Sequence, residues 1–183
     1  IRLVCREGKV GDLLALLIAG RVDVVLTDEA AAPDLRRRVC SHTLGRSEIS
    51  FCAAPPLAAR MRRGFPGSLA LAPALLPAAG TGLRAELDRW LAARGLNVSS
   101  RAEFDDAALA KVAAAEGHGF IAVPAVVAAD ACARYGLEEV GRAKGSRVRF
   151  FALTIDRSPG GPVKDILSSA TRLGPNASPA SKN

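Results

Sequence analysis

Residues 10–28 of this 183-residue chain read VGDLLALLIAGRVDVVLTD, and this stretch decides the fold class. Its first part places leucines and an isoleucine on a broad apolar face, which predicts a helix over 10–19. Gly20 follows, where a left-handed residue commonly ends a helix. Residues 22–26 are almost wholly apolar and mostly β-branched, which is typical of a strand buried on both faces of a parallel sheet. With a short strand expected at 2–6, these elements predict one βαβ unit over 2–26.

The alternation of strand and helix patterns continues along the chain. Further helices are expected at 57–63, 81–95, 106–116, 124–135 and 161–173. Further strands are expected at 37–45, 48–54, 69–72, 97–104, 120–123, 137–142 and 147–155. Thr81 is a good N-cap for its helix, and Asp105 is expected to cap the next one. Such alternation predicts an α/β fold with mainly parallel sheets.

Composition excludes several classes of protein. Apolar residues make up 49% and charged residues 23%, which predicts a folded chain with a sizeable core. No run of 18 apolar residues occurs, so no membrane span or membrane partner is predicted. The net charge of +7 permits anionic partners but specifies none. With only 4% aromatic residues, a stacking platform for single-stranded nucleic acid is not expected.

The cysteines and histidines do not form a metal-binding pattern. The cysteines are Cys5, Cys40, Cys52 and Cys132, and no CxxC pair occurs. With only His42 and His118 besides, no zinc site is predicted. We interpret the cysteines as reduced thiols of a cytoplasmic protein. The chain opens at Ile1 without a signal peptide, and we interpret it as a fragment of a longer protein.

Motifs for catalysis or for a cofactor are also absent from the sequence. There is no GxSxG nucleophile elbow, no GxGxxG fingerprint and no Walker loop. His118 lies between two glycines and is interpreted as a turn residue, whereas His42 either faces a cleft or packs in the core. The sequence therefore predicts neither an enzyme nor a cofactor.

Candidate binding residues lie where strands end and helices begin. Gly80-Thr81-Gly82 opens a helix, and it forms either an anion site or a plain N-cap. Asp105 and Asp106 hold the corresponding place before the helix over 106–116, and Asp28 follows the strand expected at 22–27. Ligands of open α/β sheets bind outside the carboxyl ends of strands, so each aspartate is either a helix cap or a ligand residue.

Residues 13–28 resemble the effector-binding domain of LysR-type transcriptional regulators, in which a leucine-rich helix ends in glycine before a strand. Three later stretches, in this order, resemble the regulators of that family that activate the sodium/proton antiporter. They are LPAAGTGLRAELDRWL at 76–91, EFDDAALAK at 103–111, and the motifs AVP and YGLEEVGR between 122 and 142. The resemblance covers about residues 1–173.

This resemblance implies a two-lobed fold like the type II periplasmic binding proteins. Lobe one is expected at 1–48 plus 151–173 and lobe two at 49–150, followed by a flexible tail at 174–183. The whole DNA-binding domain is expected to be missing. The first strand and the first helix of the effector domain are expected to be missing as well. DNA is therefore expected to bind only through that N-terminal domain. A homodimer or homotetramer is implied, and Ala-rich helix faces at 106–116 and 124–135 would allow close contacts.

The implied function is the sensing of a small molecule or ion between the two lobes. The expected ligand residues are Thr27, Asp28, Ser41, His42, Thr81, Asp105, Asp106 and Pro124. Hydroxyls and helix amides suit an anion, whereas the carboxylates suit a hard cation such as sodium, to which the antiporter subgroup responds. Two alternatives on the same scaffold stay open: an enzyme, and a periplasmic solute-binding protein with a Cys40–Cys52 disulfide.

Overall fold

The computed structural model describes residues 2–156 and 158–170, which form two compact units. Unit 1 comprises residues up to Arg46 together with those from Arg149 onward, and unit 2 comprises Ser47–Val148. The lobe boundaries expected from the sequence, at 48/49 and 150/151, differ from these by two residues each. The tail expected at 174–183 lies outside the described residues.

The sheet of unit 2 is built around a short central strand. β3 (Pro73–Pro77) pairs in parallel with β4 (Ser99–Phe104) on one side and with β5 (Phe120–Pro124) on the other. β5 in turn pairs antiparallel with β2 (Cys40–Ala53), so that Ile49 lies opposite Pro124. Residues 74–76 and 120–123 are buried, as expected for strands covered on both faces.

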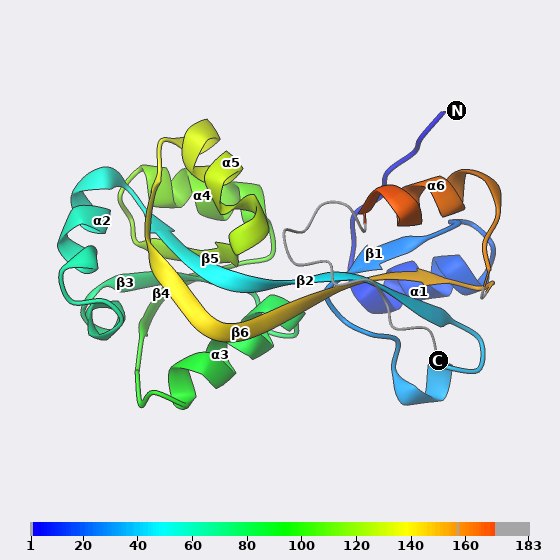
Figure 1. Cartoon of the computed structure of the whole chain (residues 1–183), viewed down its shortest axis with the longest axis horizontal. Helices are drawn as coiled ribbons and strands as arrows, with labels where there is room; N and C mark the ends of the chain where they lie inside the picture. The colour runs from blue at the N-terminus through cyan, green and yellow to red at the C-terminus, as the bar shows by residue number, and fades with distance from the viewer. Residues whose placement is uncertain (1, 157, 171–183) are drawn as a thin grey trace. The chain divides into compact units, whose positions relative to one another are not determined.

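Helices cover both faces of this sheet (Figure 1). α4 (Ala107–Ala115) and α5 (Ala125–Tyr135) lie on one face, and α3 (Gly82–Ala92) lies on the other. α2 (Pro55–Arg62) and the short 3₁₀ helix η2 (Gly67–Leu71) connect β2 to β3. The helices expected at 81–95, 106–116 and 124–135 are therefore confirmed, with slightly shorter bounds.

Four aromatic rings pack together on the α3 side of the sheet. The ring centroid of Phe51 lies 5.8 Å from that of Phe65, 5.6 Å from Trp90 and 5.9 Å from Phe120. Phe51 and Phe120 are almost completely buried. Tilted and edge-on pairs at such distances stabilise a core beyond the burial of their surface, so these rings join β2, the α2–η2 connection, α3 and β5.

Unit 1 has a smaller core around α1 (Val10–Ile18). β1 (Val25–Thr27) pairs antiparallel with the end of β6 (Glu138–Thr154), with Val25 opposite Leu153. Its remaining elements are the 3₁₀ helix η1 (Pro33–Leu35) and α6 (Gly161–Ala170). The whole sheet has the strand order β1-β6-β2-β5-β3-β4. The buried apolar residues of the unit 1 core are Leu14, Leu17, Val25, Ala31, Val39, Phe151 and Leu153.

The end of α1 follows from its sequence. Gly20 has φ +67°, which is the left-handed conformation that glycine adopts most easily. Its amide donates to the Leu17 carbonyl at 3.0 Å, and the Arg21 amide donates to Leu16 at 2.9 Å. These two bonds make a Schellman motif and confirm both the helix and its predicted glycine cap.

The βαβ unit predicted over 2–26 is wrong. Residues 2–9 form no strand, and β1 is a three-residue strand that pairs antiparallel rather than parallel. Val25 is buried, but Leu26 is 58% exposed, so only one face of this strand is covered. The β-branched run was interpreted as buried on both faces because periodicity alone does not show how many layers surround a strand.

Two pairs of predicted strands are in fact single long strands. The strands expected at 37–45 and 48–54 form β2, and those expected at 137–142 and 147–155 form β6. The glycines between them do not turn the chain. Gly145, at φ +86°, lies within the strand, and its amide donates to Glu48 Oε1 at 2.9 Å. With β1 and β2 each in an antiparallel pair, the sheet is mixed rather than mainly parallel.

Two smaller predictions are also corrected. The strand expected at 69–72 is displaced to β3, because residues 67–71 form a 3₁₀ helix before Pro73. The N-cap of α4 is Asp106 rather than Asp105. Among the described helices, none is both long and apolar enough to cross a membrane.

The close packing of β3 against Gly119, just before β5, predicts that adding one methyl group at Gly119 destabilises the protein. A Cβ built on Gly119 would lie 2.4 Å from the Pro73 carbonyl oxygen, a backbone atom that cannot move without disturbing β3. We expect Gly119→Ala to lower the free energy of unfolding by about 1–3 kcal/mol, measured by urea denaturation. Gly45→Ala is the control, because its Cβ would meet nothing within 4 Å. Equal stability of the two variants would contradict this packing.

Candidate functional site

The carboxyl ends of three parallel strands lie side by side in unit 2. β3, β4 and β5 end at Pro77, Phe104 and Pro124, and a helix follows each of them. The amide of Ala78 donates to the Phe104 carbonyl at 2.9 Å, so the first two ends are held together. Three helix starts therefore converge on one edge, which is where ligands of α/β sheets bind.

Thr81 caps α3 at this edge. Its Oγ1 accepts from the Arg84 amide at 3.1 Å and donates to the Ala78 carbonyl at 3.3 Å. The Thr81 side chain is only half-buried. The sequence left an anion site and a plain N-cap open, and the structure shows that the cap is made.

Arg84, in the first turn of α3, ties the same edge together. Its guanidinium donates to the Pro77 carbonyl at 2.8 Å and pairs with Glu103 at 2.9 Å and Asp88 at 3.0 Å. Burial opposes the charge of Arg84, but the hydrogen bonds to Glu103 and Asp88 outweigh it and raise the pKa of the guanidinium. Arg84 therefore stays charged, with much of its hydrogen-bonding capacity used within the protein.

Asp105 and Asp106 differ in role although they are neighbours. Asp106 Oδ1 accepts from the amides of Ala108 at 2.7 Å and Leu109 at 3.2 Å, and it thereby caps α4. Both carboxylates are exposed, and no comparable helix cap is made by Asp105. Asp106 has one oxygen committed to the helix, whereas Asp105 is the carboxylate that the strand end presents without a capping task.

α5 is capped by a residue that sequence analysis missed. Pro124 precedes the helix and has no side-chain acceptor, so Ser47 of β2 supplies one: its Oγ accepts from the Val126 amide at 3.1 Å. Ser47 reaches this position because β2 runs antiparallel beside β5. No local pattern marks Ser47 as a cap, since it lies far from α5 in the sequence.

The predicted ligand residues of unit 1 make mainly local contacts. Thr27 Oγ1 accepts from the Glu29 amide at 3.1 Å, and Ser41 Oγ accepts from the Ala31 amide at 3.3 Å. Asp28 lies next to Glu29, whose pKa is raised by burial and by the charge of Asp28. These contacts place Thr27 and Ser41 in turn-stabilising roles.

His42 packs against a buried threonine. Its Nε2 lies 2.8 Å from Thr154 Oγ1, and that hydroxyl donates its only proton to the Asp156 carbonyl. Thr154 must then accept, so His42 Nε2 carries a hydrogen. The ring of His42 is half-buried, and its contact with Thr154 leaves both interpretations of His42 open.

Comparison with known proteins identifies the family. A family model described as the LysR substrate binding domain matches residues 1–162. The chain belongs to this family. The resemblance inferred from the sequence is thereby confirmed.

LysR proteins with known roles and structures are similar to this chain. The transcriptional activator protein NhaR of Escherichia coli (strain K12) is 29% identical over 158 residues, which are 86% of this chain and 51% of that protein; NhaR of Shigella flexneri gives the same values. This chain thus spans about half the length of these curated relatives.

Solved structures confirm the α/β fold of LysR effector domains, which resembles that of type II periplasmic binding proteins. The effector-binding domain of QuiR in complex with shikimate is similar with a TM-score of 0.67 and 12% identity, over 90% of this chain and 77% of that one. The regulatory domain of HypT from Salmonella typhimurium gives a TM-score of 0.64 at 15% identity, over 89% and 77% of the two chains.

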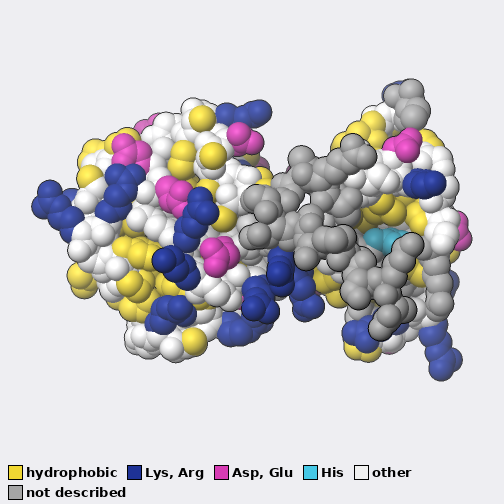
Figure 2. All heavy atoms as spheres, viewed as in Figure 1, with side chains coloured by type: hydrophobic (Ala, Val, Ile, Leu, Met, Phe, Trp, Pro, Cys, Tyr) yellow, Lys and Arg dark blue, Asp and Glu magenta, His cyan; other side chains and the backbone are white. Residues whose placement is uncertain are grey.

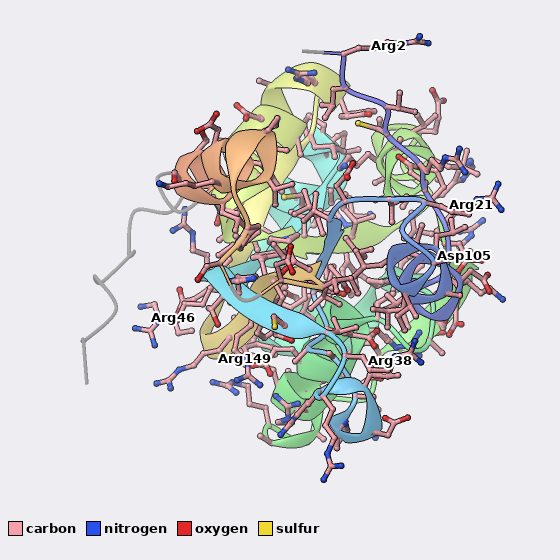
Figure 3. All side chains as sticks on the ribbon, turned by 90° about the vertical axis from the view of Figure 1, so that its right-hand side faces the viewer. Arg2, Arg21, Arg38, Arg46, Asp105 and Arg149 are labelled. Carbon is pink, nitrogen blue, oxygen red and sulfur yellow. The ribbon has the colours of Figure 1, made fainter. Side chains whose placement is uncertain are left out.

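The positive charge of the chain is spread over exposed side chains. The exposed arginines include Arg36, Arg37, Arg38, Arg60, Arg62 and Arg63. On the face seen in Figure 2, Lys and Arg side chains occupy several separate places. The arginines labelled in Figure 3, among them Arg46 and Arg149 of unit 1, are exposed too. Within residues 2–156 and 158–170, no group of three or more His, Cys, Asp or Glu side chains is arranged to hold a metal ion.

A buried hydroxyl of β2 joins an ion pair that lies within β6 of unit 2. The completely buried Ser50 Oγ donates to Glu139 Oε1 at 2.9 Å, and Arg142 donates to the same oxygen at 2.7 Å. Arg62 donates to the Glu139 carbonyl at 2.8 Å. The hydrogen bond from Arg142, together with that from Ser50 and the nearby Arg62 charge, outweighs burial and lowers the pKa of Glu139.

This lowered pKa predicts a pH-dependent contribution to stability. Because the folded-state pKa lies below the ordinary value of 4.5, the contribution is complete above about pH 4.5 and is lost as the pH falls through the folded-state pKa. We expect Glu139→Gln to cost about 1 kcal/mol at pH 7, by urea denaturation, because the pair is partly exposed. The difference from wild type should shrink below about pH 4.

The control for this pH dependence is Asp130→Asn, which neutralises an exposed carboxylate of α5. Its effect should be small at pH 7. A Glu139→Gln difference that stays constant down to pH 3.5, about one unit below the ordinary pKa, would show that the carboxylate charge contributes nothing.

Proposed function

We propose that this chain is the effector-sensing part of a longer LysR-type transcriptional regulator. The proposal is that the longer protein contacts DNA through a segment outside this chain and acts in the cytoplasm. The family membership and the similarity to NhaR, a transcriptional activator, support it. The same relatives favour a regulator over an enzyme or a periplasmic solute-binding protein, and we propose that the chain catalyses no reaction.

A disulfide between Cys40 and Cys52, which the periplasmic alternative would allow, is absent from this structure, in which both thiols are free. Both residues lie on β2, separated by on the order of 40 Å of extended chain. Cys40 Sγ instead donates to the Ile155 carbonyl at 3.7 Å.

The effector is proposed to bind at the edge of unit 2 where β3, β4 and β5 end. The convergence of three helix starts on this edge is the observation that carries the proposal, because the helix dipoles favour a negative charge there. Thr81, Asp105, Asp106 and Pro124 lie there, and Ser47 joins them. Thr27, Asp28, Ser41 and His42 stay predictions for unit 1.

We favour a small anion over a cation as the effector. Asp106 is committed to capping α4, and the positive ends of three helices oppose a cation at the same edge. The QuiR effector domain, which shares this fold, is in complex with shikimate. Sodium, which the antiporter subgroup suggested, is the alternative that the same experiment tests.

Thermal melting with added ligand tests this proposal. Shikimate and inorganic phosphate are the anion probes, and sodium is compared with potassium at constant chloride. A ligand at about 100 times its dissociation constant stabilises by about 2.7 kcal/mol, which raises the melting temperature by several degrees. We expect an anion to do so, and we expect Thr81→Val and Ser47→Ala each to reduce the ligand-induced shift by at least about half, because each removes a hydroxyl from this edge.

Thr43→Val is the matched control for these variants, because Thr43 is an exposed threonine of β2 in unit 1. It should leave the ligand-induced shift unchanged. If Thr81→Val and Ser47→Ala show the same ligand-induced shift of the melting temperature as wild type, the effector binds elsewhere. If sodium stabilises the protein and potassium does not, the cation alternative replaces the anion.

We further propose that the chain forms homodimers through α4 and α5, as the resemblance to LysR-type regulators implies; a homotetramer is the alternative for the longer protein. Leu109 and Val112, one helical turn apart on α4, are 55% and 47% exposed. Val126 and Val127 of the neighbouring α5 are 40% and 42% exposed. Adjacent exposed apolar side chains are typical of an interface.

Sedimentation velocity at tens of micromolar tests this dimer. We expect the wild-type chain to sediment as a dimer and Leu109→Glu to sediment as a monomer, because a buried unpaired carboxylate weakens an apolar interface. Leu71→Glu is the control, since Leu71 is 87% exposed on η2 and should not affect assembly. Monomers of the wild type at this concentration would contradict the proposal.

A further inference from the structure

Two cysteines from different elements of unit 2 face each other in its core. Cys52 lies on β2 and Cys132 lies on α5, and their Sγ atoms are 3.7 Å apart. Cys52 is completely buried, whereas Cys132 is half-buried. The surrounding side chains are apolar, including Leu75, Ile121 and Leu137. The two sulfurs are therefore in van der Waals contact, and one of them belongs to a residue that is only half-buried.

The surroundings hold this contact in place. β2 and α5 are also joined by the bond from the Val126 amide to Ser47, near the start of the helix. Closing a disulfide requires the sulfurs to approach from 3.7 Å to about 2.05 Å, so the proposed bond requires side-chain rotation or a shift of α5. The other cysteines are not part of this pair: Cys5 is exposed, and Cys40 contacts Ile155 in unit 1.

We propose that Cys52 and Cys132 form a reversible disulfide when the protein meets a peroxide, which makes this pair an oxidation site within unit 2. The inference does not depend on the effector or on the proposed function. It predicts a modification that pins α5, whose first turn lies at the candidate effector edge, to β2.

The reaction has two balanced steps. Cys132 Sγ first attacks one oxygen of hydrogen peroxide, the O–O bond breaks, a sulfenic acid forms and one water leaves. Cys52 Sγ then attacks Cys132 Sγ, the S–O bond breaks, the S–S bond forms and a second water leaves. The two thiol protons end in the two waters, and the peroxide is the oxidant. A cellular thiol reductant reverses the bond by thiol–disulfide exchange.

The order of the steps follows from the unequal surroundings of the two sulfurs. Burial raises the pKa of the Cys52 thiol strongly, and the nearby Cys132 raises it further. Cys52 is therefore a poor first nucleophile toward peroxide, which also reaches it less easily. Cys132 belongs to the less buried of the two residues, and Cys52 is already in contact with it to resolve the sulfenic acid.

Peptide mapping of the whole chain tests the proposal directly. Cys5→Ser and Cys40→Ser are combined so that only the pair can react. The folded protein is treated with hydrogen peroxide, quenched in acid, unfolded and alkylated. We expect the loss of two hydrogen atoms, no alkylation, and a dithiothreitol-sensitive link between the tryptic peptides 47–60 and 112–134. The oxidised chain should show no covalent link to a second chain. Its melting temperature should be on the order of 5 °C higher than that of the reduced chain.

Other outcomes would overturn the proposal. The first is that both thiols still react with the alkylating agent after peroxide treatment. The second is that oxygen is added to Cys132 while Cys52 stays a free thiol. The third is that disulfide links form only between two chains. In the Cys132→Ser variant of the same protein, Cys52 should stay reduced at the same peroxide dose. A melting curve checks that this variant is folded. If Cys52 is oxidised there as fast as Cys132 is in the parent, the order of attack is wrong.

Discussion

The packing of Phe51 against three other rings is the interaction on which unit 2 depends. Phe51 is completely buried, and its neighbours Phe65, Trp90 and Phe120 come from three different parts of the chain. This cluster fixes β2 beside β5 and places α3 on its face of the sheet. The positions of the strand ends, and hence of the candidate site, follow from that arrangement.

β2 serves both faces of the sheet at once because successive side chains of a strand point in opposite directions. Phe51 faces the aromatic cluster, while Ser50 and Cys52 face the other side. Ser50 binds Glu139 of β6, and Cys52 contacts Cys132 of α5. A few residues further back, Ser47 caps α5. One strand thus anchors a helix, a neighbouring strand and the core, in keeping with the complete burial of residues 49–53.

The sequence predicted helices well and strand pairing poorly, for physical reasons. Helix caps are local, so Thr81 and Gly20 could be assigned from their neighbours. The continuity of β2 and β6 could not be assigned in this way. The sequence does not show whether a glycine turns the chain or continues a strand. Antiparallel pairing of β1 depends on residues more than a hundred positions away.

The same reasoning explains how much of the candidate site was predictable. Thr81, Asp105, Asp106 and Pro124 were found because strand ends and helix starts have local signatures. Ser47 was missed because its partner helix comes from a distant segment. The cap of α4 was assigned to Asp105 instead of Asp106 because an aspartate at either position can cap a helix. Which of Cys40, Cys52 and Cys132 meet also required the three-dimensional structure.

The division of the chain also determines the order in which it can fold during synthesis. Unit 2 is contiguous, from Ser47 to Val148, so a ribosome releases all of it before the end of β6 appears. Unit 1 cannot complete its sheet until then, because Val25 pairs with Leu153. Closing that long loop is slow for a free chain but less costly once unit 2 has folded and shortened it. β1 therefore pairs only after the last strand has been made.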